Sequence, residues 1–334
     1  MTDRLSSQTL RYLQGAAYLV VILWGIRSAS AILVPVLSGL LLAYGFLPLP
    51  HWFMKRFAMG KRTAIALASV LMGALILGSA LLLYWRFAQI REKLPIYQEH
   101  VINLYHNVSV FLQARGIEIA GVDAARSYLS DHVSEYVGMV AARAAVFLGD
   151  GLLIAILASY FLVTMAEQVG GKRGSFAEGL AYYGGDVQRY VAITAKTGAI
   201  AALANLVLLS ILGVDFALVW CVLGFFMSFI PNVGFVVAIA PPILLALVMS
   251  GWTIALLVGG GLIVINLLQE YGLNPIFMKK GVDVSFIEII VSLMFWSFLL
   301  GTAGAILAVP LTLALRRFIE KLATDGDRAK AHSG

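Results

Sequence analysis

Hydrophobic runs separated by short polar stretches make up most of this chain. Six runs approach or exceed the roughly 20 apolar residues that span a bilayer; they lie at residues 12–26, 31–49, 63–85, 144–165, 197–212 and 252–268. Two longer runs, residues 216–250 and 286–315, are each interrupted near the middle. The pattern predicts an all-α polytopic membrane protein with about eight hydrophobic segments.

The first interruption is Ile-Pro-Asn-Val-Gly at residues 230–234, and the second is Gly-Thr-Ala-Gly at residues 301–304. Proline donates no backbone hydrogen bond, and glycine relaxes the chain. Backbone groups freed at membrane depth are tolerated only against protein or a water-filled cavity. The two interruptions have two explanations: two kinked helices without a site, or the binding site of a transporter. Because the interruptions are paired in two halves of a membrane protein, they favour a binding site.

Basic residues set the expected topology. Residues 51–62 form a loop with basic residues and no acid, so the positive-inside rule places this loop and the N-terminus in the cytoplasm. If residues 216–250 cross once, Lys279 and Lys280 fall outside. If each interrupted run is instead a re-entrant hairpin, both lysines and the C-terminus lie in the cytoplasm. We therefore predict six full spans plus two re-entrant hairpins in an inverted repeat, with Pro231-Asn232 and Gly301-Thr302 facing one substrate site.

The stretch 86–143 has apolar residues at helical spacing and balanced charges, which predicts extracytoplasmic amphipathic helices broken near residues 116–122. We expect a homo-oligomer held by these helices and the early spans. The chain divides into N-terminal spans (1–85), the amphipathic helices (86–143), a fourth span with a cytoplasmic amphipathic helix (144–196), a transport core (197–315) and a cytoplasmic tail (316–334).

Composition excludes several classes of protein. The 334 residues are 60% hydrophobic and 13% charged, whereas soluble domains carry roughly 25% charged residues. The net charge of +6 comes from basic residues at the ends of apolar runs, so it signals orientation and not a nucleic-acid partner. Cys221 is the single cysteine, which excludes an intrachain disulfide. No zinc pair of the HExxH kind and no phosphate-binding GxxxxGK[ST] loop occurs, so we expect neither an enzyme nor a cofactor or metal.

Several motifs of the second half resemble the AI-2E family of bacterial inner-membrane transporters. They are residues 213–220 (GVDFALVW), 229–234 (FIPNVG), 240–247 (APPILLAL), 274–275 with 278–281 (NP, MKKG), 292–301 (SLMFWSFLLG) and 307–312 (LAVPLT). The resemblance is specific over residues 186–320 and implies a multi-pass inner-membrane protein that exports autoinducer-2, a quorum-sensing signal, or a related small molecule. Some family members look like sodium- or proton-coupled antiporters. Ser228 stands where many members have Asn, and Glu288 where an apolar residue is expected.

The candidate substrate-binding residues are uncharged and gather at the interruptions and in the spans before them. They are Asn205, Ser228, Pro231, Asn232, Gly234, Asn266, Gly301, Thr302 and Gly304. Broken helix ends offer backbone N–H groups to anions and carbonyls to cations. The alternative for Asn205 and Asn266 is hydrogen bonding between helices, worth about 0.6–2 kcal/mol in membranes. Such a site suits a neutral, hydroxyl-rich molecule or a dehydrated cation.

Two acids are candidates for ion coupling, because ionisable residues at membrane depth are rare. Glu270 closes the sixth span, and Glu288 opens the second hairpin. Glu270 as an interfacial anchor and Glu288 as a partner of Lys279 or Lys280 are the structural alternatives. Three functions remain: an exporter of a small polar metabolite such as autoinducer-2, a sodium or other cation/proton antiporter, and a membrane scaffold that transports nothing. Interrupted helices argue against the scaffold.

Overall fold

The computed structural model describes residues 2–116, 127, 146, 149–167, 175–231, 233–277 and 285–332. Within these ranges the regular secondary structure is helical, and eight helices are long and apolar enough to cross a membrane. This confirms the predicted all-α polytopic architecture. The eight are Thr9–Ser28, Ser30–Phe57, Lys61–Arg86, Gly149–Glu167, Gly184–Ile211, Val233–Ser250, Trp252–Phe277 and Ile287–Lys321.

The chain divides into two compact units. Unit 1 is Met1–Ser69, Ile156–Ala192 and Gly281–Gly334, and unit 2 is Val70–Ala155 and Ile193–Lys280. Helices α4 (Lys61–Gln113) and α6 (Ser175–Ile211) each contribute to both units. The predicted transport core, residues 197–315, is therefore shared: residues 197–280 belong to unit 2 and residues 281–315 to unit 1.

Unit 1 is built around α11 (Phe286–His332), which packs against α1 (Thr2–Ser28) and α2 (Ser30–Phe46). Small residues allow these helices to approach one another. A Cβ atom on Gly39 of α2 would lie 2.9 Å from the Leu157 Cβ atom, so α2 meets the helix Gly149–Glu167 at a distance that only glycine permits. The short α3 (Pro48–Phe57) follows α2 directly.

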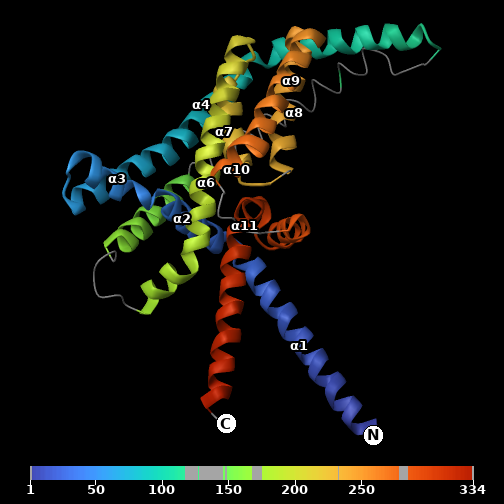
Figure 1. The fold of residues 1–334 in the computed structure, drawn as a ribbon. Helices are drawn as coiled ribbons and strands as arrows, with labels where there is room; N and C mark the ends of the chain where they lie inside the picture. The colour runs from blue at the N-terminus through green and yellow to red at the C-terminus, as the bar shows by residue number, and fades with distance from the viewer. Residues whose placement is uncertain are drawn as a thin grey trace. The chain divides into compact units, whose positions relative to one another are not determined.

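Unit 2 contains α7 (Ala217–Met227), α8 (Val233–Ser250) and α9 (Trp252–Leu267), which continues through the π-helix η1 (Leu268–Leu273) into α10 (Asn274–Phe277). Helices α8 and α9 lie side by side (Figure 1). Gly251 joins them with φ 81° and ψ −177°, a conformation that is essentially confined to glycine. Their buried core consists of Leu209, Val214, Ala246, Ala255, Val258 and Leu262.

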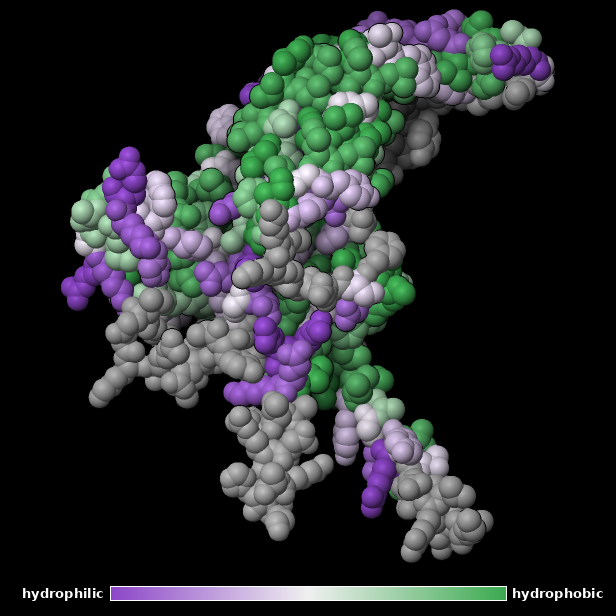
Figure 2. Space-filling model, viewed as in Figure 1, coloured by the Kyte–Doolittle hydropathy of each residue, from purple (hydrophilic) through white to green (hydrophobic). Residues whose placement is uncertain are grey.

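Hydrophobic side chains also cover the outside of these helices. Leu244 of α8 and Leu256 of α9 are 59% and 71% exposed, and Figure 2 shows a broad hydrophobic surface over both helices. A soluble monomer rarely exposes so large an apolar patch. This surface suits lipid contact, as expected of membrane-spanning helices.

The structure differs from the sequence-based expectations at three places. Residues 51–62, expected to be a loop, mostly belong to α3, and only residues 58–60 lie between α3 and α4. The third span and the start of the amphipathic stretch form one helix, α4, of 53 residues with Pro95 inside it. The sixth span ends in a π-helix, which the hydropathy pattern could not indicate. Residues 117–126 and most of 128–148 lie outside the described residues, as do Lys279 and Lys280.

Candidate functional site

The first interruption separates α7 from α8, and the two helices pack against each other. The Ser228, Phe229 and Ile230 amides still bond back to α7 carbonyls, and the helical pattern resumes where the Gly234 amide donates to the Ile230 carbonyl (3.0 Å). A Cβ atom on Gly234 would lie 1.9 Å from the Met227 carbonyl oxygen. The returning backbone therefore touches the departing one. We call α7, residues 228–232 and α8 hairpin 1; Asn232 itself lies outside the described residues.

Helix α6 faces hairpin 1 through small and polar residues. A Cβ atom on Gly198 would lie 3.0 Å from the Ser228 Cβ, and one on Gly224 would lie 3.6 Å from the Asn205 Nδ2 atom. The Ser228 hydroxyl donates to the Gly224 carbonyl (2.9 Å). Among the described residues, the buried Asn205 Oδ1 atom finds no hydrogen-bond partner. An unsatisfied buried acceptor is costly, about 1–3 kcal/mol, so the Oδ1 atom is open to a partner, and the role of Asn205 stays a prediction.

The second interruption lies inside α11, at Gly301, where φ is 68° and ψ is −151°. The chain doubles back there, as the red ribbon of α11 shows in Figure 1. The Ser292 hydroxyl donates to the Ala308 carbonyl (3.0 Å) and lies 2.5 Å from the Thr312 hydroxyl. The Trp296 indole also donates to the Thr312 hydroxyl (3.0 Å). A straight helix would separate Ser292 from Thr312 by about 30 Å. These bonds therefore establish a folded-back pair of arms, residues 286–315, which we call hairpin 2.

The two hairpins are built alike at their tips. A Cβ atom on Gly304 would lie 2.0 Å from the Trp296 carbonyl oxygen and 3.0 Å from the Leu300 Cβ atom. In hairpin 1 the corresponding atoms for Gly234 are the Met227 carbonyl oxygen and the Ile230 Cβ atom, at 3.1 Å. Each glycine is the last residue of its interruption and faces the residue four positions before it. The two tips thus share a glycine contact, while the inverted repeat stays a prediction.

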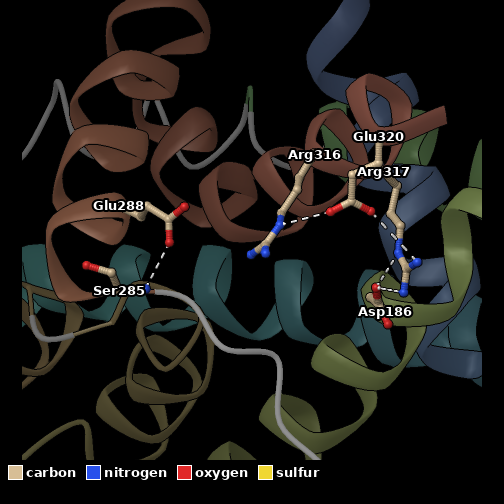
Figure 3. A network of polar contacts seen from close by, with 6 residues as sticks. All are labelled: Asp186, Ser285, Glu288, Arg316, Arg317 and Glu320. Atoms are coloured by element: carbon tan, nitrogen blue, oxygen red, sulfur yellow. Dashed lines mark hydrogen bonds and ion pairs between the residues drawn. The ribbon is translucent and has the colours of Figure 1, made fainter. Parts of the chain in front are cut away.

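Each end of α6 carries an ion pair to another helix of the same unit. Near its start, Asp186 accepts from Arg317 of α11 (2.6 Å; Figure 3). Beyond its end, Asp215 accepts from Lys93 of α4 (2.6 Å) and from the Tyr97 hydroxyl (3.0 Å). Asp186 lies in the first turn of the candidate span Gly184–Ile211, and Asp215 follows the end of that span, so the two aspartates lie at opposite ends of it.

The cluster around Asp215 also fixes the approach to hairpin 1. The Asp215 carbonyl accepts from the Trp220 indole (2.9 Å), and Lys93 lies 5.7 Å from the Phe216 ring centroid. Burial raises the pKa of the Tyr97 phenol above its ordinary value, and the hydrogen bond to Asp215 adds to the rise. The phenol therefore keeps its proton in the alkaline range where a free tyrosine ionises. The Asp215 carboxylate therefore joins the turn between α6 and α7 to α4.

The two acids expected to couple ions are both exposed and both hydrogen-bonded locally. Glu288 accepts from the Ser285 backbone N–H (2.9 Å; Figure 3), while the Ser285 hydroxyl accepts from the Ile287 N–H (3.3 Å). This is a capping box, which the spacing Ser-x-x-Glu at residues 285–288 could have indicated. Glu270 lies in η1 and accepts from the Asn274 side chain (2.9 Å). Their role in ion coupling stays a prediction.

Known proteins resemble this chain over nearly its whole length. The sequence model of the AI-2E family transporters matches residues 16–324. The chain belongs to the AI-2E transporter family. It is 32% identical to the AI-2 transport protein TqsA of Escherichia coli (strain K12), over 91% of this chain and 90% of the relative. It is 27% identical to YhhT of the same organism, whose name gives it a presumed transport role, over 91% of this chain and 88% of the relative.

In this AI-2E transporter the candidate residues fall into two groups. Unit 2 holds Asn205, Ser228, Pro231, Gly234, Asn266 and Glu270, and unit 1 holds Glu288, Gly301, Thr302 and Gly304. Asn205 and Ser228 lie in the facing surfaces of α6 and α7. Asn266 is half-buried near the end of α9, and Thr302 is exposed beside Gly301. Sequence reasoning missed Ser292, Trp296 and Thr312, because hydroxyl groups inside an apolar run give no signal until the chain is known to fold back.

Proposed function

We propose that this protein is a secondary transporter that exports autoinducer-2 or a related small polar metabolite across the bacterial inner membrane. The observation that carries the proposal is the pair of hairpins with matching glycine contacts, in a chain of the AI-2E family. Interrupted, paired helices are the usual construction of a transporter's binding site. The name of TqsA, which specifies AI-2 transport, supports the choice of substrate.

The chemistry of the hairpins supports a neutral substrate rich in hydroxyl groups. The candidate groups at the tips are hydroxyls, amides and backbone carbonyls. The Asn205 Oδ1 atom is a buried acceptor without a partner among the described residues, and a substrate hydroxyl would satisfy it. The two candidate acids are exposed and engaged in local bonds. They therefore give less support to a charged substrate than the uncharged groups give to a neutral one.

Flux through proteoliposomes tests the proposal. Vesicles that contain the wild-type protein should release autoinducer-2 faster than protein-free vesicles. Asn205→Leu removes a buried polar group and should slow release at least about tenfold, the loss expected when a buried polar partner disappears. Thr302→Val removes an exposed hydroxyl beside Gly301 and should slow release less. Arg316→Gln is the control, because Arg316 pairs with Glu320 on its own helix. Equal release with and without protein would contradict autoinducer-2 export.

The cation/proton antiporter remains the second candidate function. The double variant Glu270→Gln, Glu288→Gln should abolish proton-coupled flux if either acid carries the proton. Retained coupling in that variant would remove both acids from the mechanism. We also propose that the termini are cytoplasmic, that the protein forms a homo-oligomer in the lipid bilayer, and that both tips serve one substrate site. A cysteine pair at Asn232 and Thr302 tests the last point: no cross-linking with short or medium reagents would contradict it.

A further inference from the structure

The corner between α2 and α4 in unit 1 carries an unusual distribution of charge. The sequence contains no acidic residue between Asp3 and Glu92. Four basic residues fall within residues 55–62 of that stretch: Lys55, Arg56, Lys61 and Arg62. They occupy the end of α3 and the start of α4, at the facing ends of the consecutive candidate spans Ser30–Phe57 and Lys61–Arg86. The corner therefore lies at the membrane surface.

Helix α3 presents aromatic and basic side chains together. Phe53 is buried, whereas Trp52 and Phe57 are 54% and 58% exposed. The three rings contact one another, with the Trp52 centroid 5.3 Å from that of Phe53 and 5.6 Å from that of Phe57. The Arg56 guanidinium lies 5.9 Å from the Phe57 centroid. Phe53 thus holds an exposed aromatic pair beside cationic groups.

The backbone turns sharply after this helix. Ala58 has φ 50° and ends α3 in the left-handed conformation, and the Thr63 hydroxyl donates to the Gly60 carbonyl (2.7 Å) at the start of α4. The Lys61 ammonium donates to the Glu167 carbonyl (2.9 Å), at the end of the helix Gly149–Glu167. Lys61 therefore anchors the corner to its own unit.

The other three cations remain available to an external partner. Lys55, Arg56 and Arg62 are exposed, and within the described ranges none of them forms an ion pair with a carboxylate. Figure 2 shows strongly hydrophilic side chains gathered around α3. Three cations at the membrane surface, next to exposed tryptophan and phenylalanine rings, match the phosphate and the glycerol–acyl boundary of a lipid.

We propose that the α3 corner, formed by Trp52, Lys55, Arg56, Phe57 and Arg62, binds the headgroup of an anionic phospholipid. Charge complementarity favours an anionic over a zwitterionic phospholipid, because a zwitterionic headgroup carries an ammonium group that the three cations repel. Each basic residue near an anionic surface strengthens binding by about fivefold. The proposal is independent of what the protein transports.

Native mass spectrometry of the full-length protein in detergent tests the proposal by competition between phosphatidylglycerol and phosphatidylcholine. Wild type should retain phosphatidylglycerol preferentially, and glycerol phosphate should not displace it. The triple variant Lys55→Gln, Arg56→Gln, Arg62→Gln should lose this preference. The control variant Arg11→Gln, Arg86→Gln, Arg316→Gln removes the same number of positive charges elsewhere and should keep the preference for phosphatidylglycerol. Equal loss in both triple variants, or unchanged preference in the first, would overturn the proposal.

The triple variant removes orientation signals as well as a binding surface, so single variants provide an independent measurement. Arg56→Gln and Arg62→Gln each leave three of the four cations and should each weaken phosphatidylglycerol binding about fivefold. Trp52→Ala changes no charge and should weaken phosphatidylglycerol and phosphatidylcholine alike. A single variant that inserts normally and binds phosphatidylglycerol as tightly as wild type would contradict a role for that charge.

Discussion

Hairpins 1 and 2 share the construction of their tips but differ in what holds their arms together. In hairpin 2, side-chain bonds among Ser292, Trp296 and Thr312 connect the two arms. In hairpin 1, the Ser228 hydroxyl bonds to the backbone of its own helix, and the contact is made by backbone and apolar side chains. Hairpin 2 is therefore held by directional bonds along its length, whereas hairpin 1 is held chiefly at its tip and at its base near Asp215.

The largest expected effect tests what the hairpins share. Gly234→Ala and Gly304→Ala would each place a methyl group about where a carbonyl oxygen lies, which forces the arms apart. Overpacking of this kind costs about 1–3 kcal/mol or more, so both variants should unfold at lower temperature and lose transport. Thermal unfolding in detergent and flux in proteoliposomes measure the two losses.

The control for these variants is Gly260→Ala in α9. A Cβ atom on Gly260 would meet nothing within 4 Å, and alanine is the better helix former by about 1 kcal/mol. This variant should be as stable as wild type or more so. A wild-type unfolding temperature in Gly234→Ala or Gly304→Ala would refute the close backbone contact.

The next largest effect on stability is expected to differ between the two hairpins. Thr312→Val removes the hydroxyl that links both Ser292 and Trp296 to the second arm of hairpin 2. It should destabilise the protein by about 1–3 kcal/mol, because the buried Ser292 hydroxyl and the indole N–H lose a partner. Ser228→Ala in hairpin 1 removes a bond within one helix and should cost less. If the two variants had equal unfolding temperatures, the distinction between the hairpins would fail.

The next prediction concerns the ion pairs Asp186–Arg317 and Lys93–Asp215, whose loss should change stability little. Fixing each pair in place should instead affect the transport mechanism. Exposed pairs contribute only about 0.2–1 kcal/mol, so Asp186→Asn and Asp215→Asn should barely change unfolding. Under alternating access, however, thiol-specific cross-linkers about as long as the replaced ion pairs should each hold one membrane face closed, between cysteines at Lys93 and Asp215 or at Asp186 and Arg317. A cysteine at Thr302 should then be labelled from one side only, and from opposite sides in the two cross-linked proteins.

That experiment requires Cys221→Ser, since Cys221 is the cysteine of the natural chain. Labelling does not require the substrate to be known, so its outcome is separate from that of the flux assay. Labelling of Thr302 from both sides in either cross-linked protein would argue against closure at that ion pair. The smallest effect is expected for Arg316→Gln, whose pair with Glu320 lies within one exposed turn of α11; stability and flux should match wild type.

The sequence predicted the features that depend on apolar length and on breaks in it. The positions of the spans follow from the apolar runs, and the interruptions at Pro231 and Gly301 follow from the proline and glycine residues there. Both signals are present in the local sequence. Residues 51–62 were misjudged because their basic residues suggested a loop, although Pro48 and Pro50 suit the first turn of a helix. The Thr312 bonds and the Lys93–Asp215 pair could not be predicted, because each joins residues that only the fold brings together.

Pro95 gives the Asp215 cluster a further consequence. Proline removes one backbone hydrogen bond from α4, and this happens between the two residues that Asp215 binds. One carboxylate oxygen takes Lys93, before the proline, and the other takes Tyr97, after it. Asp215 thus braces α4 across the site of the missing backbone bond, and loss of this carboxylate should loosen the helix there. A single side chain from the turn between α6 and α7 in this way supports a helix of 53 residues at its proline.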